Sequence, residues 1–214
     1  MGDNNKPFLK WAGGKTRLSD FIAGHFPGTC RHRLIEPFAG SAALSCMLEF
    51  DHYCLSDVNP DLMSVYASLK EHGQDFIDYA RSFFTLQNNH KDRFHALRTT
   101  FNRAHPGELR AALFIYLNRH AFNGLCRYNS KGEFNAPFGA YKKPFFPEGR
   151  MQAFVRKSSR MDLFCQDFRI TMRACGPDDL IYCDPPYDEP QAAEGGFAFT
   201  APVFNRLRDR KSVV

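Results

Sequence analysis

The stretch between residues 33 and 57 constrains the fold more than any other part of the chain. Residues 33–38 form a short apolar run typical of a buried strand, and Ala39-Gly40-Ser41 follows as a tight turn. Residues 42–50 predict an apolar helix, and residues 52–56 predict a second strand that ends at Asp57. A strand, a glycine turn, a helix and a second strand in this order begin a parallel α/β sheet.

The rest of the chain predicts an interruption of this sheet. Asn59-Pro60 is a good helix start, and residues 60–117 keep a helical pattern, with residues 108–117 apolar on nearly all faces and therefore expected to be buried. Residues 122–147 are rich in Gly, Asn and Pro, which predicts an irregular loop or hairpin. Residues 161–165 and 179–183 predict two more buried strands. We therefore expect an α/β domain of residues 1–59 and 146–214, interrupted by a mostly helical module of residues 60–145.

Positive charge gathers in the predicted module. Residues 91–143 hold ten Lys and Arg against three acids, a net charge of +7, whereas the whole chain carries +5. Such a block is expected either for phosphate binding or for a solvated helical surface, and charge alone leaves both open. The same block is rich in Phe, Tyr and Asn, which stack on bases and hydrogen-bond to them, and this favours nucleic acid.

Composition and local patterns exclude several other classes. No uninterrupted apolar stretch approaches the roughly 18–20 residues of a membrane-spanning helix, so we expect no membrane partner. The first residues contain no apolar signal region, which favours a cytoplasmic protein. The seven cysteines form no CxxC pair, so we expect no metal site.

The Gly40 turn and Asp57 are the first candidates for ligand binding. Small residues around Gly40 let the backbone approach a ligand at the carboxyl edge of the sheet, although the motif is not GxGxxG. Asp57 lies 17 residues further on, at the end of the next predicted strand, where an acid commonly accepts hydrogen bonds from ribose hydroxyls. A helix cap is the alternative role for Asp57.

Asp184-Pro185-Pro186-Tyr187, directly after an apolar run, is the most informative tetrapeptide. Its two prolines remove two backbone donors and hold the chain extended, which leaves carbonyl groups available as acceptors. A carboxylate, a free carbonyl and an aromatic ring then suit a planar group that bears an amine. The alternative is a strand exit stiffened by proline.

Five motifs follow one another in a fixed order. They are Lys10-Trp11-Ala12-Gly13-Gly14-Lys15, the turn from Glu36 to Ser41, Asp57, the run of residues 118–129, and Asp184 to Tyr187. In this order, and from about Pro7 to Tyr187, the chain resembles the Dam-type DNA adenine methyltransferases; residues 132–139 are similar to that family as well.

The resemblance implies a Rossmann-like methyltransferase sheet domain that binds S-adenosylmethionine, with the basic module as the recognition module for double-stranded DNA. Trp11 and Lys15 would contact the methionine end of the cofactor and Asp57 its ribose, while Asp167 and Phe168 would hold its adenine. The remaining implied cofactor residues are Glu36, Phe38, Gly40, Ser41 and Asp184.

The family methylates the exocyclic amino nitrogen of adenine in duplex DNA, often in GATC. That nitrogen is a poor nucleophile. Two hydrogen bonds from its N–H groups, one to the Asp184 carboxylate and one to the Pro185 carbonyl, would concentrate its lone pair. The base must first leave the double helix, and Tyr187 is the natural stacking partner for the flipped adenine. No metal is required.

The implied DNA-binding residues lie mostly in the module. Arg127 would pair with a guanine, with a phosphate contact as the alternative, and Phe122 would fill the gap left by the flipped base unless it belongs to the local core. Lys91, Arg93 and Arg98 are expected to contact phosphates. The other implied residues are Lys10, Arg119, Asn123, Leu125, Asn135 and Pro137.

Family members continue for several strands beyond the tetrapeptide, whereas 27 residues follow Tyr187 here. We therefore expect a truncated chain that lacks the last strands of the sheet. The sequence does not give the oligomeric state, for which we favour a monomer. The alternative functions are a catalytically inactive DNA-binding remnant of such an enzyme and, more remotely, a methyltransferase acting on RNA.

Overall fold

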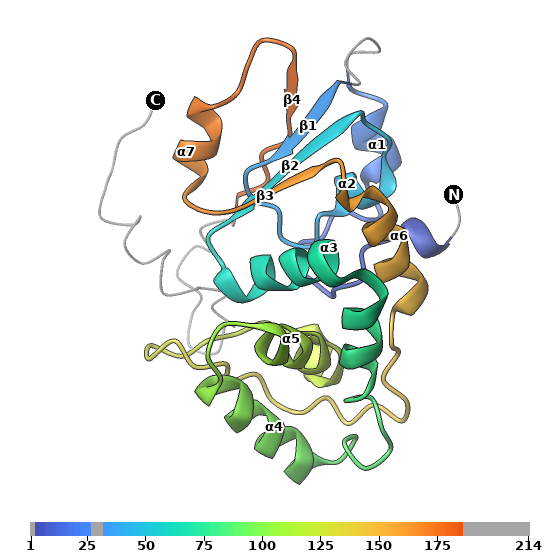
Figure 1. Ribbon diagram of the computed structural model, residues 1–214, viewed down its shortest axis with the longest axis vertical. Coiled ribbons are helices and arrows are strands. Elements are labelled where there is room, and N and C mark those ends of the chain that lie inside the picture. The colour runs from blue at the N-terminus through green and yellow to red at the C-terminus, as the bar shows by residue number, and fades with distance from the viewer. Residues whose placement is uncertain (1–2, 27–31, 186–214) are drawn as a thin grey trace, which may run out of the picture.

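The computed structural model describes residues 3–26 and 32–185, and the predictions for Tyr187 and for residues 186–214 lie outside the described part. Figure 1 shows a sheet with α3 along it and a group of helices on the far side of α3. The elements are η1 (Asp3–Asn5), α1 (Ser19–Ala23), β1 (Arg33–Glu36), α2 (Ala43–Met47), β2 (His52–Asp57), α3 (Pro60–Arg81), α4 (Lys91–Arg103), α5 (Glu108–His120), η2 (Phe122–Gly124), α6 (Glu148–Ser158), β3 (Met161–Cys165), α7 (Phe168–Arg173) and β4 (Asp179–Ile181).

The four described strands form one sheet in the order β3-β2-β1-β4, and every neighbouring pair is parallel. Leu34 of β1 lies opposite Tyr53 on one side and Leu180 on the other, which fixes the register. The predicted α/β fold with a Rossmann-like parallel sheet is confirmed. Because all four strands run the same way, their carboxyl ends meet at one edge, where α/β proteins bind their ligands.

The core runs from the sheet into the helices. Leu34, Tyr53 and Leu55 are fully buried between the layers, and α3 contacts β2 and β3 on one side and α5 on the other. Of residues 108–117, which were predicted to be buried, residues 111–117 are all buried, whereas Glu108 and Leu109 in the first turn of α5 are exposed. Since α3 packs against both predicted parts, the division into residues 1–59 plus 146–214 and residues 60–145 stays a prediction.

The start of α3 agrees with its sequence. The Asn59 side chain accepts hydrogen bonds from the backbone N–H groups of Asp61 and Leu62, and Pro60 occupies the first helical position. Within the helix Gly73 has a φ of 53°, a conformation that glycine adopts without steric cost, and the helix kinks there. The long helical pattern therefore resolves into a bent α3 followed by α4 and α5.

Two strand predictions need correction. β3 was predicted to be buried, but it is the outermost strand on its side of the described sheet. Only Met161 of β3 is buried, and Phe164 is 42% exposed. β4 ends at Ile181 and is half-buried, because it too lies at an edge of the described sheet. An ion pair of Arg33 with Asp179, at 2.7 Å, joins β4 to β1.

The short helix α2 is held by side chains at both ends. Glu36 accepts hydrogen bonds from the backbone N–H of Ser45 at 3.0 Å and from its hydroxyl at 2.5 Å. The buried Lys157 donates to the carbonyl groups of Ser45, Cys46 and Leu48 at the other end. These bonds satisfy backbone groups that a five-residue helix leaves unpaired.

Residues 121–138 form the hairpin that the sequence predicted as one of two alternatives. Isolated antiparallel bridges join Ala121 to Phe138 and Tyr128 to Phe134. We refer to this segment as the recognition hairpin. Within the described residues, no helix is long and apolar enough to cross a membrane.

Candidate functional site

The carboxyl edge of the sheet gathers four predicted site segments. Gly40 follows β1, Asp57 ends β2, Asp167 follows β3 and Asp184 follows β4. The rings of Phe38 and Phe168, from the first and third of these segments, lie 4.9 Å apart at an interplanar angle of 31°. Segments more than 140 residues apart in sequence thus meet at one edge.

The Gly40 turn is held from two sides. Asp57 accepts hydrogen bonds from the backbone N–H of Gly40 and of Asn59, each at 3.0 Å, and the buried Tyr66 hydroxyl donates to the Gly40 carbonyl at 2.6 Å. Burial raises the pKa of Asp57, although hydrogen bonds from the backbone of Gly40, Asn59 and Val58 act in the opposite direction. Asn59 caps α3, and Asp57 instead supports the turn.

Gly40 also allows Trp11 to approach the turn closely. The φ of Gly40 is +47°, and a Cβ atom there would lie 2.8 Å from the indole nitrogen of Trp11. A Cβ at Gly14 would lie 3.1 Å from the Trp11 carbonyl and 3.5 Å from the Ser41 hydroxyl. The N-terminal segment therefore packs on the turn where any residue larger than glycine would displace it. This cradle fits the close backbone approach expected of a nucleoside-type cofactor.

Lys15 and Asp184 form the contact that joins the two ends of the described chain. The Lys15 ammonium lies 2.5 Å from a carboxylate oxygen of Asp184 and donates to the Gly13 carbonyl at 2.9 Å. Pro185 follows at an exposed position. Two predicted site residues that are 169 positions apart are therefore neighbours.

Glu36 lies beneath the turn. Glu36 is 3% exposed and its carboxyl group binds Ser45, so it supports α2 from the core. Burial raises the pKa of Glu36 to about 7 against the opposing effect of the Ser45 hydrogen bonds, and the charge of Asp184 adds to the increase.

At the end of β3, Asp167 is engaged with Arg169. Its carboxylate accepts bonds from Nε and Nη2 of Arg169, both at 2.8 Å, and from the backbone N–H of that residue at 2.9 Å. These bonds lower the pKa of Asp167. Asp167 thereby caps α7 and positions Phe168 opposite Phe38.

A cavity of about 310 Å³ connects this edge with the predicted DNA-binding residues. Its walls include Trp11 and Ser41 from the turn, together with Lys10, Arg119 and Asn123. The backbone of Lys10 is fixed by Asn118, which accepts from its N–H at 2.9 Å and donates to its carbonyl at 2.7 Å. Asn118, which sequence reasoning did not single out as a site residue, thus links the N-terminal segment to α5.

The predicted DNA residues differ in exposure. Arg119 is 5% exposed and donates to the Phe145 carbonyl at 2.9 Å; burial lowers its pKa to about 10, with a further contribution from Arg150. Phe122, by contrast, is 45% exposed, and the backbone N–H of Asn123 donates to the Tyr141 hydroxyl. Arg119 therefore lines the inner wall of the cavity, whereas Phe122 faces solvent.

Within the recognition hairpin, Arg127 is bound to Asn135. Its Nε donates to Oδ1 of Asn135 at 2.8 Å and its Nη2 to the carbonyl of the same residue at 3.0 Å. The exposed Pro137 accepts a bond from the backbone of Phe122, and Leu125 packs against the core. The structure thus brings the implied recognition residues together along one hairpin.

Arg98 of α4 is bound to the same hairpin. Its Nη1 donates to the Ala136 carbonyl at 2.9 Å, and burial lowers its pKa. The phosphate contact expected of Arg98 stays a prediction.

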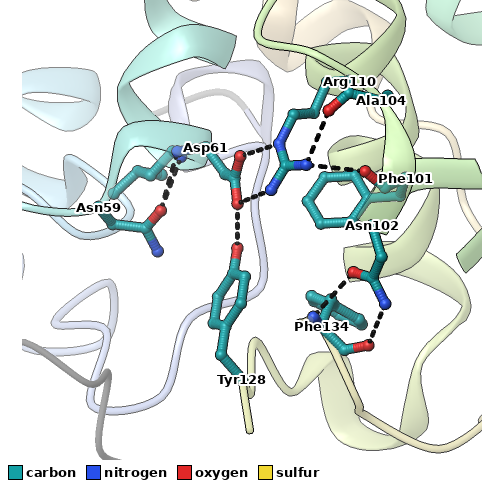
Figure 2. A network of polar contacts seen from close by, with 9 residues as sticks. Asn59, Asp61, Phe101, Asn102, Ala104, Arg110, Tyr128 and Phe134 are labelled. Carbon is teal, nitrogen blue, oxygen red and sulfur yellow. Dashed lines mark hydrogen bonds and ion pairs between the residues drawn. The ribbon is translucent and has the colours of Figure 1, made fainter. Parts of the chain in front are cut away.

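A partly buried polar network that the sequence did not reveal supports the hairpin (Figure 2). Arg110 of α5 binds both carboxylate oxygens of Asp61, at 2.5 and 3.1 Å, and the Tyr128 hydroxyl donates to one of these oxygens at 2.7 Å. Asn102 of α4 exchanges two bonds with the backbone of Phe134, at 2.9 and 3.1 Å. Pairings across 32 to 67 positions leave no local sequence signal.

Comparison with known proteins places the whole arrangement in context. Residues 11–200 match the family model described as D12 class N6 adenine-specific DNA methyltransferase. The chain is 46% identical over 210 residues to the DNA adenine methylase of Serratia marcescens, 43% over 182 residues to that of Vibrio cholerae and 41% over 194 residues to that of Escherichia coli K12.

These matches cover 98%, 85% and 90% of this chain and 76%, 65% and 68% of the respective relatives. Among the described residues, no cluster of three or more His, Cys, Asp or Glu side chains is arranged to hold a metal ion.

Proposed function

This chain belongs to the D12 class of N6 adenine-specific DNA methyltransferases, and from that premise we propose that it transfers the methyl group of S-adenosylmethionine to the exocyclic amino nitrogen of adenine in double-stranded DNA, within GATC. The observation that carries the proposal is the contact of Lys15 with Asp184 beside the Gly40 turn. It unites the motifs that the family resemblance assigns to the cofactor and to the reacting base.

The cofactor would lie along the carboxyl edge of the sheet. Trp11 and the Gly40 turn would hold it closely, Asp57 would face its ribose, and the ring pair of Phe38 and Phe168 would flank its adenine. When bound, S-adenosylmethionine supplies a methyl group that is already activated by a sulfonium charge. The chain's own task is therefore alignment of the two reactants.

Asp184 and Pro185 would act on the target base. The Asp184 carboxylate and the Pro185 carbonyl would each accept one hydrogen bond from the adenine amino group, which draws the nitrogen lone pair out of the ring and toward the methyl donor. Asp184 has two carboxylate oxygens, so one can accept from Lys15 while the other faces the base. Tyr187 remains the proposed stacking partner of the flipped adenine.

The helical module would hold the duplex. Its net charge of +7 over residues 91–143 provides sequence-independent affinity for phosphates, which weakens as salt rises. Arg127 and Asn135 on the recognition hairpin would read bases, and Lys10 with Arg119 would line the passage from the DNA to the cofactor edge. A DNA substrate also implies work in the compartment that holds the DNA, which is the cytoplasm in bacteria such as those of the relatives named above.

A transfer assay on the 214-residue chain tests the proposal. The chain is incubated with methyl-labelled S-adenosylmethionine and a duplex that contains GATC, a duplex with the site permuted, or an RNA duplex of the same sequence. We expect label in N6-methyladenine, identified by nucleoside mass spectrometry, from the GATC duplex alone. Label in RNA or in cytosine contradicts the proposal, and DNA binding without any transfer favours an inactive DNA-binding protein.

A further inference from the structure

We propose that Tyr128 and Asp61 are positioning residues for target recognition, because their hydrogen bond fixes the recognition hairpin to the start of α3 and so to the cofactor edge of the sheet. The inference rests on the proposed function. It assigns a role in sequence discrimination to two residues that need not touch the DNA.

Asp61 connects α3 with α5 and with the recognition hairpin. It lies four residues beyond Asp57, in the first turn of α3, and is 6% exposed. Arg110 binds both of its oxygens, and the same guanidinium donates to the Phe101 and Ala104 carbonyls at the end of α4 at 2.8 and 3.1 Å (Figure 2). The Asp61 carboxylate therefore has a fixed place between α3, α4 and α5.

The hairpin reaches this fixed point through the Tyr128 hydroxyl. Burial and the negative charge of Asp61 raise the pKa of Tyr128 far above its ordinary value, so the hydroxyl keeps its proton and acts as a donor. The ring packs edge-on against Phe134 with centroids 5.7 Å apart. Tyr128 thus holds one strand of the hairpin from its core side.

Other contacts fasten the hairpin elsewhere. Asn102 and Arg98 of α4 bind Phe134 and Ala136 of the hairpin, respectively. Tyr128 ties the hairpin to α3, the helix that begins at the cofactor edge. It is thus the link between base recognition and the reacting centre among these three anchors.

Loss of this link should move the side chains that read bases. Arg127 immediately precedes Tyr128, and its guanidinium is held by Asn135 on the opposite strand. Bidentate base contacts tolerate little displacement, so a loosened hairpin lowers affinity for the correct site more than for an altered one. Phosphate contacts made elsewhere are unaffected, and binding without sequence preference persists.

The test compares Tyr128→Phe with Tyr53→Phe. Tyr53→Phe is the control because it also removes a hydroxyl that bonds within the fold. The Tyr53 hydroxyl donates to the Leu48 carbonyl and accepts from the backbone N–H of Phe50, at the sheet and away from the hairpin. Dissociation constants are measured for a GATC duplex and for duplexes with one base pair replaced. Cofactor affinity is followed by the fluorescence of Trp11, the single tryptophan of the chain.

We expect Tyr128→Phe to reduce the preference for GATC about tenfold, the scale of one lost hydrogen bond to a charged group, with cofactor affinity unchanged. Tyr53→Phe should lower stability and leave the preference intact. Wild-type preference in Tyr128→Phe, or an equal loss in Tyr53→Phe, overturns the positioning role. A wild-type chain without preference or methyl transfer overturns the proposed function instead.

Hydrogen exchange gives a second readout that needs no DNA. The amide of Asn135 donates to the Arg127 carbonyl and that of Asn129 to the Glu133 carbonyl, both at 2.9 Å across the hairpin. Faster exchange of these two amides in Tyr128→Phe than in Tyr53→Phe is the expected result. Equal exchange in the two variants overturns the claim that Tyr128 anchors the hairpin.

Discussion

The ammonium nitrogen of Lys15 lies 2.5 Å from a carboxylate oxygen of Asp184, although the two residues are 169 positions apart. The contact closes the N-terminal segment onto the exit of β4. An ion pair near the surface stabilises a fold by about 1 kcal/mol or less, so its significance lies in what it positions.

Replacement of Lys15 should therefore separate binding from stability. We expect Lys15→Met to leave the unfolding midpoint nearly unchanged and to weaken S-adenosylmethionine binding roughly tenfold, since one charged contact to the methionine end is lost. Fluorescence titration of Trp11 measures the affinity. Arg81→Met, which breaks an ion pair with Glu148 remote from the site, is the control and should not change it. Equal affinity in Lys15→Met and wild type contradicts the assignment of Lys15.

The Gly40 turn allows a sharper comparison. In Gly40→Ala the new Cβ is strained by the positive φ and also clashes with the Trp11 indole. In Gly132→Ala the φ of +76° causes strain, but the space around the new Cβ is open. Both variants should lose about 1–2 kcal/mol from backbone strain, and Gly40→Ala should lose more because Trp11 must move. Its tryptophan emission should shift, and cofactor affinity should fall. Equal unfolding free energies and equal emission for the two variants would show that Trp11 does not pack on the turn.

Glu36 should make stability depend on pH. Its pKa of about 7 in the folded protein exceeds the ordinary value of 4.5, so its protonated form favours folding. This contribution is fully present below the unfolded pKa and is lost as pH rises through 7. Relative to Glu36→Gln, the wild type should lose up to about 3 kcal/mol of unfolding free energy between about pH 5 and about pH 8.

Urea unfolding of both proteins across this range measures the effect. Glu49→Gln serves as the control: bonds from Lys157 and Arg160 outweigh desolvation and lower the pKa of Glu49, so its titration lies below this pH range. Parallel pH profiles for wild type and Glu36→Gln would mean that Glu36 is ionised in the folded protein.

Arg127 should discriminate between bases. Arg127→Ala is expected to cost roughly 1–3 kcal/mol in binding to the target duplex and to relax preference at one base pair. Asn135→Ala should act in the same direction, since Asn135 holds the guanidinium. Lys131→Ala, at an exposed position of the same hairpin, should weaken binding to all sequences alike. A uniform loss in Arg127→Ala would identify a phosphate contact instead.

Much of the fold follows from local sequence. The pattern of a strand, a glycine turn, a helix and a second strand predicted β1, α2 and β2, and Asn59-Pro60 predicted the start of α3, because these signals act over a few residues. The burial of β3 could not be predicted correctly, since the apolar sequence of Leu163 and Phe164 does not reveal that the strand lies at the edge of the sheet.

In the site too, local sequence predicted some features, and features that depend on tertiary packing could not be predicted. Short motifs identified Gly40, Asp57 and Asp184 as candidates, and the parallel sheet brings their segments to one edge. The supports of these residues were not predictable, because Tyr66 meets Gly40 and Tyr128 meets Asp61 through tertiary packing alone. The bond of Arg98 to the Ala136 carbonyl was not predictable for the same reason: sequence gives the charge of this residue but not the direction in which it points.

The rate of methyl transfer by Asp184→Asn tests the account most directly. The variant keeps the size of the side chain but loses the charge that draws on the adenine amino group, so the single-turnover rate on a GATC duplex should fall by about a hundredfold or more, with cofactor binding weakened but not lost. Asp162→Asn, at an exposed position of β3, should retain the wild-type rate. If Asp184→Asn keeps more than about half of the wild-type rate, Asp184 does not act on the reacting base.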